Sequence, residues 1–547
     1  MTGAGALVVS VEKQDGEQPR RRFGRPGAVA LLLGLVGVSY RLVLLLLDVP
    51  GSNSDEGTFG LVAVHIAEGQ GLPIYLYGQH YMGVLESYFA APLFAVFEPS
   101  WRLLRVPILL LYAVFVYLMY RLTRRLYSPW LGVLVVGLLA LGSERVIRDG
   151  LTAVGGRAEI KPAAVLLLLL AAALGQYRIR YRWLGFGLFG LVAGLSVWSD
   201  WLVLPYLAAT IGVLLVGCWR QLLGWAGLLV LGGFALGVLP LILDNLSAPP
   251  GQDSWSVFQQ LSAGAEATSL GDQVRGAVLG IPLATGLCPA ECASWQMWWG
   301  VLYLSLLLGA AALAVVGLRR PGGQGDVAAR RDRRIRHVAQ LALAVAGVLA
   351  VIGYARSSAA ALTPISSARY LTMLQVSLPA VLWPLWLVAG WVRRRTYPLF
   401  KRGAGVVAAA LLVAFSASMV FATAGQIAKI EPIRAEEHRS WAIATSLQAA
   451  GIRYVYSEYW VCNRLIFTAR ERVICAVLSE DLRPGQDRYG PYPSQVHAAD
   501  RPAFVFNADS AMERTFQDYL RRHDITAELI ETDGYRIYWP TVTVRPW

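Results

Sequence analysis

The chain has 547 residues, of which 56% are hydrophobic and only 16% charged, with a mean hydropathy of +0.48. This composition is too apolar for a protein whose whole surface faces water, so it excludes a water-soluble globular protein. The net charge of +13 would suit a nucleic-acid-binding protein, but the cations lie mainly in short loops between apolar segments, which is typical of a membrane protein with basic cytoplasmic loops and argues against nucleic acid as a partner.

Apolar segments of about 20 residues, long enough to cross a hydrocarbon core as helices, recur along the first four-fifths of the chain. After a basic tail at residues 1–26, a helical membrane domain is predicted over residues 27–425. Eleven transmembrane helices are predicted, at residues 27–47, 103–122, 129–142, 160–177, 183–199, 201–217, 222–244, 297–318, 338–355, 370–391 and 404–425.

Every second connection between these segments is basic, which predicts the orientation of the chain in the bilayer. The basic segments are residues 20–22, 121–125, 178–182, 220, 319–337 and 393–402. With these in the cytoplasm, residues 48–102, 143–159, 245–296, 356–369 and 426–547 are expected outside. We therefore predict a multi-pass plasma-membrane protein with a cytoplasmic N-terminus and an extracytoplasmic C-terminal domain. The excess of arginine and alanine over lysine is typical of a GC-rich bacterial genome.

The long first outer loop, residues 48–102, begins with the adjacent carboxylates Asp55 and Glu56. Residues 57–68 and 84–97 are predicted as amphipathic helices on the membrane surface, on either side of the polar aromatic segment 75–83. Alone, the carboxylate pair is also compatible with a helix N-cap or a solvated loop.

Other ionisable residues are expected at the same membrane depth as this pair. They are Arg41, Arg145, Arg148, Asp149, Arg157, Glu159, Lys161, Asp200 and Arg369. Snorkelling can explain Arg41 or Lys161 singly. Because ionisable groups near a bilayer are costly unless they face a polar cavity, the whole set predicts such a cavity at the outer leaflet.

A cavity with both carboxylates and guanidinium groups suits glycosyl transfer from a lipid phosphate. A carboxylate can take the proton of an attacking hydroxyl, while cations stabilise the phosphate that leaves the anomeric carbon of the sugar. Arginine suits the second task because its planar fork binds phosphate oxygens in pairs.

The ordered set of motifs resembles the bacterial membrane glycosyltransferases of the C superfamily, which are related to protein O-mannosyltransferases and to the lipid A aminoarabinose transferase. The resemblance covers nearly the whole chain. The residues that carry it are Arg41, Asp55–Glu56, Tyr77–Glu86, Gly155–Glu159, Gly194–Asp200 and Arg369–Tyr370.

The resemblance implies inverting transfer of a sugar from a polyprenyl-phosphate donor to a hydroxyl of a protein, glycan or lipid acceptor. It implies that Asp55 is the general base, that Glu56 positions it or shares its proton, and that Arg369, Arg41 and Tyr370 bind the donor phosphate. The residues expected to bind sugar or acceptor are Glu159, Arg157, Gln79, Tyr81, Glu86 and Asp200. Family members differ over a divalent metal, which stays open here; the scattered histidines give no zinc motif.

The last part of the chain, residues 426–547, is predicted as a small α/β domain. Strands are expected at 453–457, 472–477 and 503–507, followed by a helix at 511–523 and a hairpin about Asp533–Gly534. The stretch Tyr459–Phe467 resembles the distal domain of bacterial relatives, where acceptor recognition or a lid is expected. Two disulfides, Cys288–Cys292 and Cys462–Cys475, are compatible with an oxidising exterior.

Two other functions are compatible with parts of this pattern. A lipid-linked glycan ligase would use the same outer-leaflet donor but transfer a whole glycan. A secondary transporter would also place charges in the membrane, but inverted repeats are expected there and none is evident.

Overall fold

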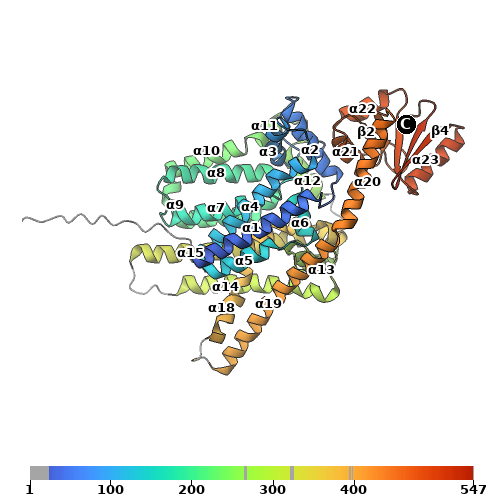
Figure 1. Cartoon of the computed structure of the whole chain (residues 1–547). Coiled ribbons are helices and arrows are strands. Elements are labelled where there is room, and N and C mark those ends of the chain that lie inside the picture. Colours follow the sequence, from blue (N-terminus) through green and yellow to red (C-terminus); the bar gives the residue numbers. More distant parts are fainter. Residues whose placement is uncertain (1–23, 264–267, 321–325, 394–395, 397, 546–547) are drawn as a thin grey trace, which may run out of the picture.

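The computed structural model describes residues 24–263, 268–320, 326–393, 396 and 398–545. The predicted basic segment 20–22 therefore lies outside the described residues. A helical body makes up most of the molecule, and a small α/β domain lies at one end of it (Figure 1). The fold class expected from the sequence, a polytopic helical protein with a C-terminal α/β domain, is confirmed.

Each predicted transmembrane segment coincides with helix. The helices of the body are α1 (Arg25–Leu46), α4 (Trp101–Leu126), α5 (Pro129–Ala140), α7 (Ile160–Gly175), α8 (Arg182–Ser199), α9 (Leu204–Leu222) with a preceding 3-10 turn (Trp201–Val203), α10 (Trp225–Gly237), α11 (Leu239–Ser247), α14 (Trp298–Arg319), α15 (Val327–Ala355), a 3-10 helix (Ala368–Ser377) followed by α18 (Leu378–Ala389), and α19 (Leu399–Ala428). In the described part of the chain, seven helical segments are long and apolar enough to cross a membrane, or nine if each of two bent pairs is one span. The chain is thus a multi-pass membrane protein, and the number of eleven spans stays a prediction.

Two predicted spans differ from the observed helices for physical reasons. The segment 222–244 is broken into α10 and α11, which are bent by 57°, because Pro240 lies in the first turn of α11 and has no backbone N–H to continue the ladder. The segment 338–355 begins earlier, at Val327, because the arginine-rich residues before it favour a helix as well.

Close approach between α8 and α10 depends on glycine. A Cβ at Gly190 would lie 2.1 Å from the carbonyl oxygen of Val230, and one at Gly233 would lie 2.3 Å from the carbonyl oxygen of Gly187. Small residues let two backbones approach in this way where no water drives the helices together.

The segments predicted to lie outside gather at the end of the body that carries the C-terminal domain (Figure 1). Helices are present where residues 57–68 and 84–97 were predicted, as α2 (Ser54–Ala67) and α3 (Leu85–Phe94). The prediction that α2 is an amphipathic helix on the membrane surface is wrong, because α2 is buried on nearly every side and packs against α3 and α21. The other short helices of these segments are α6 (Glu144–Leu151), α12 (Ser254–Ala263), α13 (Leu270–Thr285), α16 (Ser358–Leu362) and α17 (Pro364–Ser367).

The C-terminal domain contains a five-stranded sheet with the order β2-β1-β3-β5-β4. Strands β1 (Tyr454–Ser457), β2 (Ile474–Val477) and β3 (Ala503–Asn507) are parallel, and β4 (Ala527–Thr532) and β5 (Tyr535–Pro540) form the antiparallel hairpin. The helices are α20 (Ile430–Ala449), α21 (Tyr459–Thr468), α22 (Pro491–Ala498) and α23 (Ala511–Arg522). All predicted strands and the predicted helix of this domain are present.

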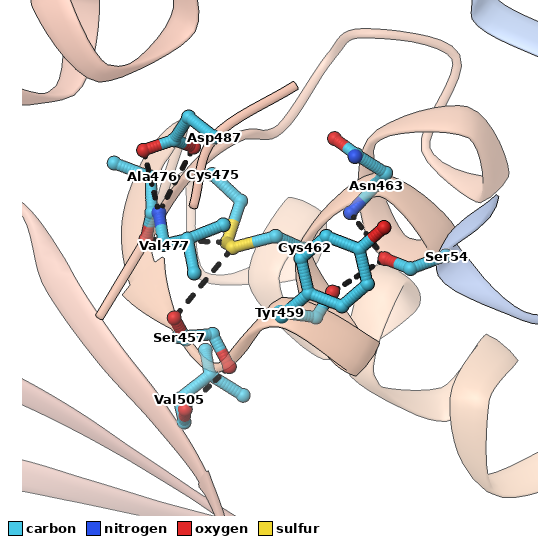
Figure 2. The surroundings of a disulfide bond; sticks show 10 residues. All are labelled: Ser54, Ser457, Tyr459, Cys462, Asn463, Cys475, Ala476, Val477, Asp487 and Val505. Atoms are coloured by element: carbon cyan, nitrogen blue, oxygen red, sulfur yellow. Dashed lines mark hydrogen bonds between the residues drawn. A yellow bond between two sulfur atoms is a disulfide. The ribbon is translucent and has the colours of Figure 1, made fainter. Parts of the chain in front are cut away.

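The C-terminal domain packs directly on the first outer loop through α2 and α21. Gly57 permits this contact, because a Cβ there would lie 2.6 Å from the carbonyl oxygen of Asn463. Ser54 donates a hydrogen bond of 2.5 Å to the carbonyl oxygen of Tyr459, and it accepts one of 3.1 Å from the backbone N–H of Asn463. The disulfide Cys462–Cys475 connects α21 to β2 beside this contact (Figure 2). The disulfide Cys288–Cys292 is formed as well.

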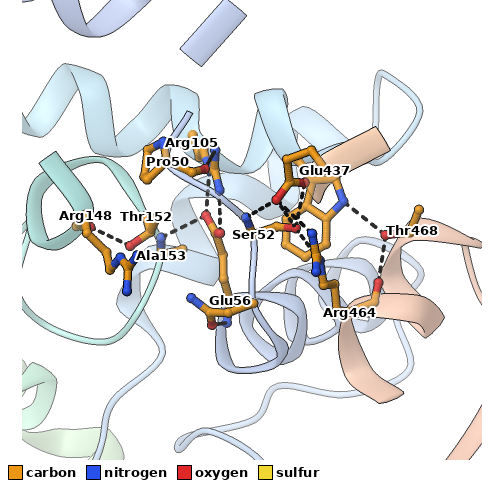
Figure 3. A network of polar contacts seen from close by, with 12 residues as sticks. Pro50, Ser52, Glu56, Arg105, Arg148, Thr152, Ala153, Glu437, Arg464 and Thr468 are labelled. Carbon is orange, nitrogen blue, oxygen red and sulfur yellow. Dashed lines mark hydrogen bonds and ion pairs between the residues drawn. The ribbon is translucent and has the colours of Figure 1, made fainter. Parts of the chain in front are cut away.

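A second connection involves Glu437 of α20, which is 5% exposed. Its carboxylate accepts hydrogen bonds from the backbone and hydroxyl of Ser52 and from Arg464 of α21, at 2.6 to 3.1 Å (Figure 3). Residues far apart in the sequence therefore hold the start of the first outer loop against the C-terminal domain.

Candidate active site

Asp55 lies in the first turn of α2, the helix that follows α1 in the chain. The helix begins there because the side chain of Asn53 accepts a hydrogen bond of 3.0 Å from the backbone N–H of Glu56. The Asp55 side chain is 30% exposed, and its Oδ1 accepts hydrogen bonds from Arg488 at 2.9 Å and from the hydroxyl of Tyr459. Both partners belong to the C-terminal domain.

Glu56 has different partners, although it is adjacent in the sequence. It is fully buried and forms a bidentate ion pair with Arg105 of α4, at 2.7 and 2.6 Å (Figure 3). Arg105 also donates to the carbonyl oxygen of Pro50 at 2.8 Å. Burial raises the pKa of Glu56, and the guanidinium of Arg105 opposes that shift. With both oxygens on Arg105, Glu56 anchors the outer loop to α4.

Arg41, predicted as a phosphate ligand, binds backbone carbonyls through two of its nitrogens, while its buried Nε has no hydrogen-bond partner among the described residues. Its guanidinium is buried and donates to the carbonyl oxygens of Gly37, Leu139, Ala140 and Leu141 at 3.0 to 3.3 Å. It lies 3.8 Å from the ring centroid of Tyr112. Three of these carbonyls end α5, where the chain turns by 90° into α6. Arg41 therefore satisfies the free carbonyls and complements the dipole of that helix end.

Arg369 and Tyr370 begin the 3-10 helix Ala368–Ser377. Arg369 donates a hydrogen bond of 3.3 Å to the Tyr370 hydroxyl, and its guanidinium lies 5.2 Å from the centroid of that ring. Within the described residues, the buried Nε of Arg369 has no hydrogen-bond partner. An unpaired guanidinium N–H is a donor available for an anion.

Tyr81 connects these groups electrostatically. Burial raises the pKa of Tyr81, and Tyr370 raises it further, while the charges of Arg488 and Arg369 lower it and Asp200 raises it. Two predicted phosphate ligands, Arg369 and Tyr370, therefore lie within electrostatic range of Tyr81, as do Arg488, which binds Asp55, and Asp200, a predicted sugar ligand. Gln79, in the same loop, has a buried side-chain oxygen that accepts no hydrogen bond from the described residues.

Glu86 of α3 and Glu159, which precedes α7, form a buried carboxyl pair. Their carboxyl groups interact closely, and neither Oε1 of Glu86 nor Oε2 of Glu159 has a hydrogen-bond partner elsewhere in the described residues. Glu86 accepts a hydrogen bond from the backbone N–H of Gly155 at 3.1 Å, and Glu159 accepts one from Ser199 at 2.6 Å. Burial and the charge of Glu159 raise the pKa of Glu86 well above its ordinary value, and burial also raises that of Glu159. The pair therefore retains a proton between its two carboxyl groups.

Asp200 and Arg157 lie next to this pair. Asp200 caps the short 3-10 turn by accepting the backbone N–H of Leu202 at 2.8 Å, and burial raises its pKa to about 6. Gly156 permits its position, because a Cβ there would lie 2.2 Å from Cβ of Asp200 and the φ of Gly156 is +71°. Arg157 forms a buried ion pair of 2.9 Å with Asp149. The structure thus brings Glu86, Glu159 and Asp200 together, and Arg157 adds a cation.

Sequence reasoning missed three residues of this region: Arg105, Tyr459 and Arg488. Arg105 gave a usable signal, because an arginine inside a predicted span needs a buried partner as much as Arg41 does. Tyr459 lies in the stretch that resembled the distal domain, but nothing in that stretch points to Asp55. Arg488 lies in a polar loop, and nothing in the sequence of that loop distinguishes it from an ordinary solvent-exposed loop.

A divalent metal is not favoured by the side chains around Asp55. Its carboxylate is bound by a guanidinium and a hydroxyl, whereas a hard cation needs several oxygen ligands at once. No group of three His, Cys, Asp or Glu side chains in the described part of the chain could hold a metal ion.

Comparisons with known proteins identify the fold. No protein-family model and no curated protein sequence matches the chain. Among solved structures, ArnT from Cupriavidus metallidurans bound to undecaprenyl phosphate matches with a TM-score of 0.60 at 12% identity, covering 95% of this chain and 99% of that one. The apo form of ArnT matches with a TM-score of 0.57 at 13% identity, covering 94% and 98%. The oligosaccharyltransferase AglB from Archaeoglobus fulgidus, in complex with an inhibitory peptide and a dolichol-phosphate, gives 0.46 at 13% identity, covering 94% and 74%. The chain therefore has the ArnT-like glycosyltransferase C-type fold that its motifs predict.

Proposed function

We propose that this protein is an inverting glycosyltransferase that moves a sugar from a polyprenyl-phosphate donor to an acceptor hydroxyl. The fold is that of a protein whose solved structure holds undecaprenyl phosphate. The observation that carries the proposal is a partly exposed carboxylate, Asp55, close enough to Arg369, a predicted phosphate ligand, for its charge to contribute to the raised pKa of that guanidinium. We place the reaction on the extracytoplasmic side of the bacterial plasma membrane, where the alternation of basic loops puts this region.

In the proposed reaction, Asp55 accepts the proton of the acceptor hydroxyl while the hydroxyl oxygen attacks the anomeric carbon. The bond between that carbon and the phosphate oxygen breaks, and polyprenyl phosphate leaves with the electron pair. Attack from the face opposite the phosphate inverts the anomeric configuration. No acid is needed for the leaving group, because the phosphate carries the charge and Arg369 stabilises it.

The other predicted residues receive supporting roles in this proposal. Tyr370 extends the phosphate site beside Arg369. Tyr81, Gln79 and Asp200 surround the sugar. The carboxylate of Asp200 accepts a hydrogen bond from a sugar hydroxyl through its remaining lone pairs. Glu86, Glu159 and Arg157 support the wall of the sugar site from behind, where Glu86 accepts from Gly155, Glu159 accepts from Ser199 and Arg157 pairs with Asp149.

The test is Asp55→Asn in the full-length protein reconstituted in lipid. The reaction is followed by release of free undecaprenyl phosphate from a panel of undecaprenyl-phosphate-linked hexoses and pentoses, with bacterial membranes as the source of acceptor. We expect the asparagine to abolish release, because it has the size of aspartate without its basicity, while binding of undecaprenyl phosphate is retained.

Asp48→Asn is the matched control, because Asp48 is the first residue of the same loop but forms an exposed ion pair with Arg102. Full release by the Asp55→Asn protein would exclude Asp55 as the base. If the unaltered protein released undecaprenyl phosphate from no donor in the panel, the proposed function would fail as a whole.

A further inference from the structure

The C-terminal domain contributes two side chains that contact the proposed base. Tyr459 is the first residue of α21, and Arg488 lies in the loop between β2 and α22. The Arg488 side chain is 8% exposed, although it is charged and belongs to a loop. A buried guanidinium in a polar loop is costly unless it is bound by fixed partners.

The direction of each hydrogen bond follows from the chemistry of arginine. A guanidinium has only donors, so the Tyr459 hydroxyl accepts the bond of 2.8 Å from Nε of Arg488. The proton of that hydroxyl is then directed to Oδ1 of Asp55, which also accepts the bond of 2.9 Å from Nη2 of Arg488. The three side chains form a closed ring of charge-assisted bonds.

The ring engages one oxygen of Asp55 and leaves the other free. Two donors converge on Oδ1, and Oδ2 accepts no hydrogen bond from any described residue. A carboxylate held by one oxygen cannot rotate freely about its terminal bond, so the second oxygen keeps one direction. This is the arrangement that a general base needs when a substrate hydroxyl must meet a lone pair in a fixed position.

Arg488 and Tyr459 are themselves held in place by their neighbours. Tyr489, next to Arg488, packs on Tyr77 with ring centroids 4.6 Å apart and on His65 at 4.9 Å. On the other side, the first turn of α21 is fixed to Ser54, and the disulfide Cys462–Cys475 connects α21 to the strand that precedes the Arg488 loop (Figure 2).

We propose that Arg488 and Tyr459 are positioning residues that orient the Asp55 carboxylate, with Oδ2 presented to the acceptor hydroxyl. The inference rests on the proposed function, and it adds that the C-terminal domain completes the catalytic site. Neither side chain needs to touch the donor. Their removal therefore affects the rate of the chemical step and not the affinity for the lipid phosphate.

The experiment compares Arg488→Gln, Arg488→Lys and Tyr459→Phe in the full-length protein in lipid. Turnover is measured as release of undecaprenyl phosphate at saturating donor, and affinity is measured directly with undecaprenyl phosphate alone. We expect Arg488→Gln to lower kcat by about 100-fold, the effect of misplacing a catalytic group, with the Kd of undecaprenyl phosphate unchanged. Arg488→Lys is expected to restore part of the rate, because an ammonium can reach Oδ1 but cannot bond Tyr459 at the same time. Tyr459→Phe, which removes a hydroxyl and nothing else, is expected to lower kcat by about 10-fold, a loss on the scale of one charge-assisted hydrogen bond.

The matched control is Arg483→Gln, an exposed arginine of the same domain that pairs with Asp481. Wild-type kcat in both Arg488→Gln and Tyr459→Phe would overturn the positioning role, and so would weakened binding of undecaprenyl phosphate with an unchanged kcat, which would make Arg488 a phosphate ligand. If Asp55→Asn loses turnover and these variants do not, only the positioning role falls. If the unaltered protein releases undecaprenyl phosphate from no donor, the proposed function fails first and this inference with it.

Discussion

Glu56 and Arg105 form a fully buried bidentate ion pair between the first outer loop and α4. Each charge compensates the other in surroundings from which water is excluded. Glu56→Ala would leave the guanidinium buried without a counter-charge, which costs about 3–5 kcal/mol. We expect a large fall in the thermal unfolding temperature of the purified protein, measured in detergent. Arg102→Ala is the control, because it breaks an exposed pair worth about 0–1 kcal/mol. Equal losses in the two variants would contradict the structural importance of the buried pair.

Arg369 and Arg41 are expected to behave differently towards the lipid phosphate. Arg369→Ala removes a guanidinium that has an unpaired N–H and, unlike Arg41, donates to no backbone carbonyl of the described residues; we expect it to weaken binding of undecaprenyl phosphate about 10- to 100-fold, the effect of one or two charge-assisted hydrogen bonds. Arg41→Ala leaves carbonyls at the end of α5 unsatisfied, so it should lower the unfolding temperature while the folded fraction keeps its affinity. Equal loss of binding in the Arg41 variant would place Arg41 in the phosphate site.

The carboxyl pair of Glu86 and Glu159 predicts a pH-dependent stability. Because the pKa of Glu86 is raised well above its ordinary value of 4.5 in the folded protein, the folded state keeps a proton that the unfolded chain releases. The free energy of unfolding therefore falls as the pH rises above about 4.5, until the folded protein also releases this proton. Glu86→Gln mimics the protonated carboxyl, and we expect it to flatten this fall. Thermal unfolding between pH 4.5 and 8.5 measures it, with the exposed Glu528→Gln as the control. An unchanged slope in the Glu86 variant would show that the pair does not hold the proton.

The disulfide Cys462–Cys475 closes a loop that begins in α21, the helix whose first residue is Tyr459. Its removal by a double change to alanine should lower the free energy of unfolding by about 3 kcal/mol, the effect expected for a loop of this length. Turnover should fall as well, because α21 loses its connection to β2. The double alanine variant of Cys288 and Cys292, which are only four residues apart, is expected to have a smaller effect. Unfolding with and without a reductant checks both, and a larger effect of the second pair would contradict the prediction.

The sequence predicted the helices and strands well because each depends on a local pattern. The predicted bounds of the apolar helices, the strands and the hairpin about Asp533–Gly534 lie within a few residues of the observed bounds for most of these elements. Asp55 and Glu56 were found as a pair, with Glu56 expected to position Asp55 or share its proton, but the buried ion pair of Glu56 with Arg105 was not predicted. Successive residues on a helix point about 100° apart, so one faces the polar region and the other faces α4.

The residues that sequence reasoning missed depend on contacts between distant parts of the chain. Arg488 and Asp55 are 433 residues apart, and only the packing of α21 on α2 brings them together. The backbone contacts of Arg41 were not predicted either, because the bend between α5 and α6 leaves carbonyls free and no sequence pattern indicates that bend.

The last helix of the body continues almost without interruption into the C-terminal domain, as α19 and α20 (Figure 1). A helix acts as a rod with a fixed rise of about 1.5 Å and a rotation of about 100° per residue. Its length therefore sets both the distance of the domain from the helical body and the direction in which its loops point. One residue inserted into α20 would rotate the domain by about 100° and so move Tyr459 and Arg488 away from Asp55.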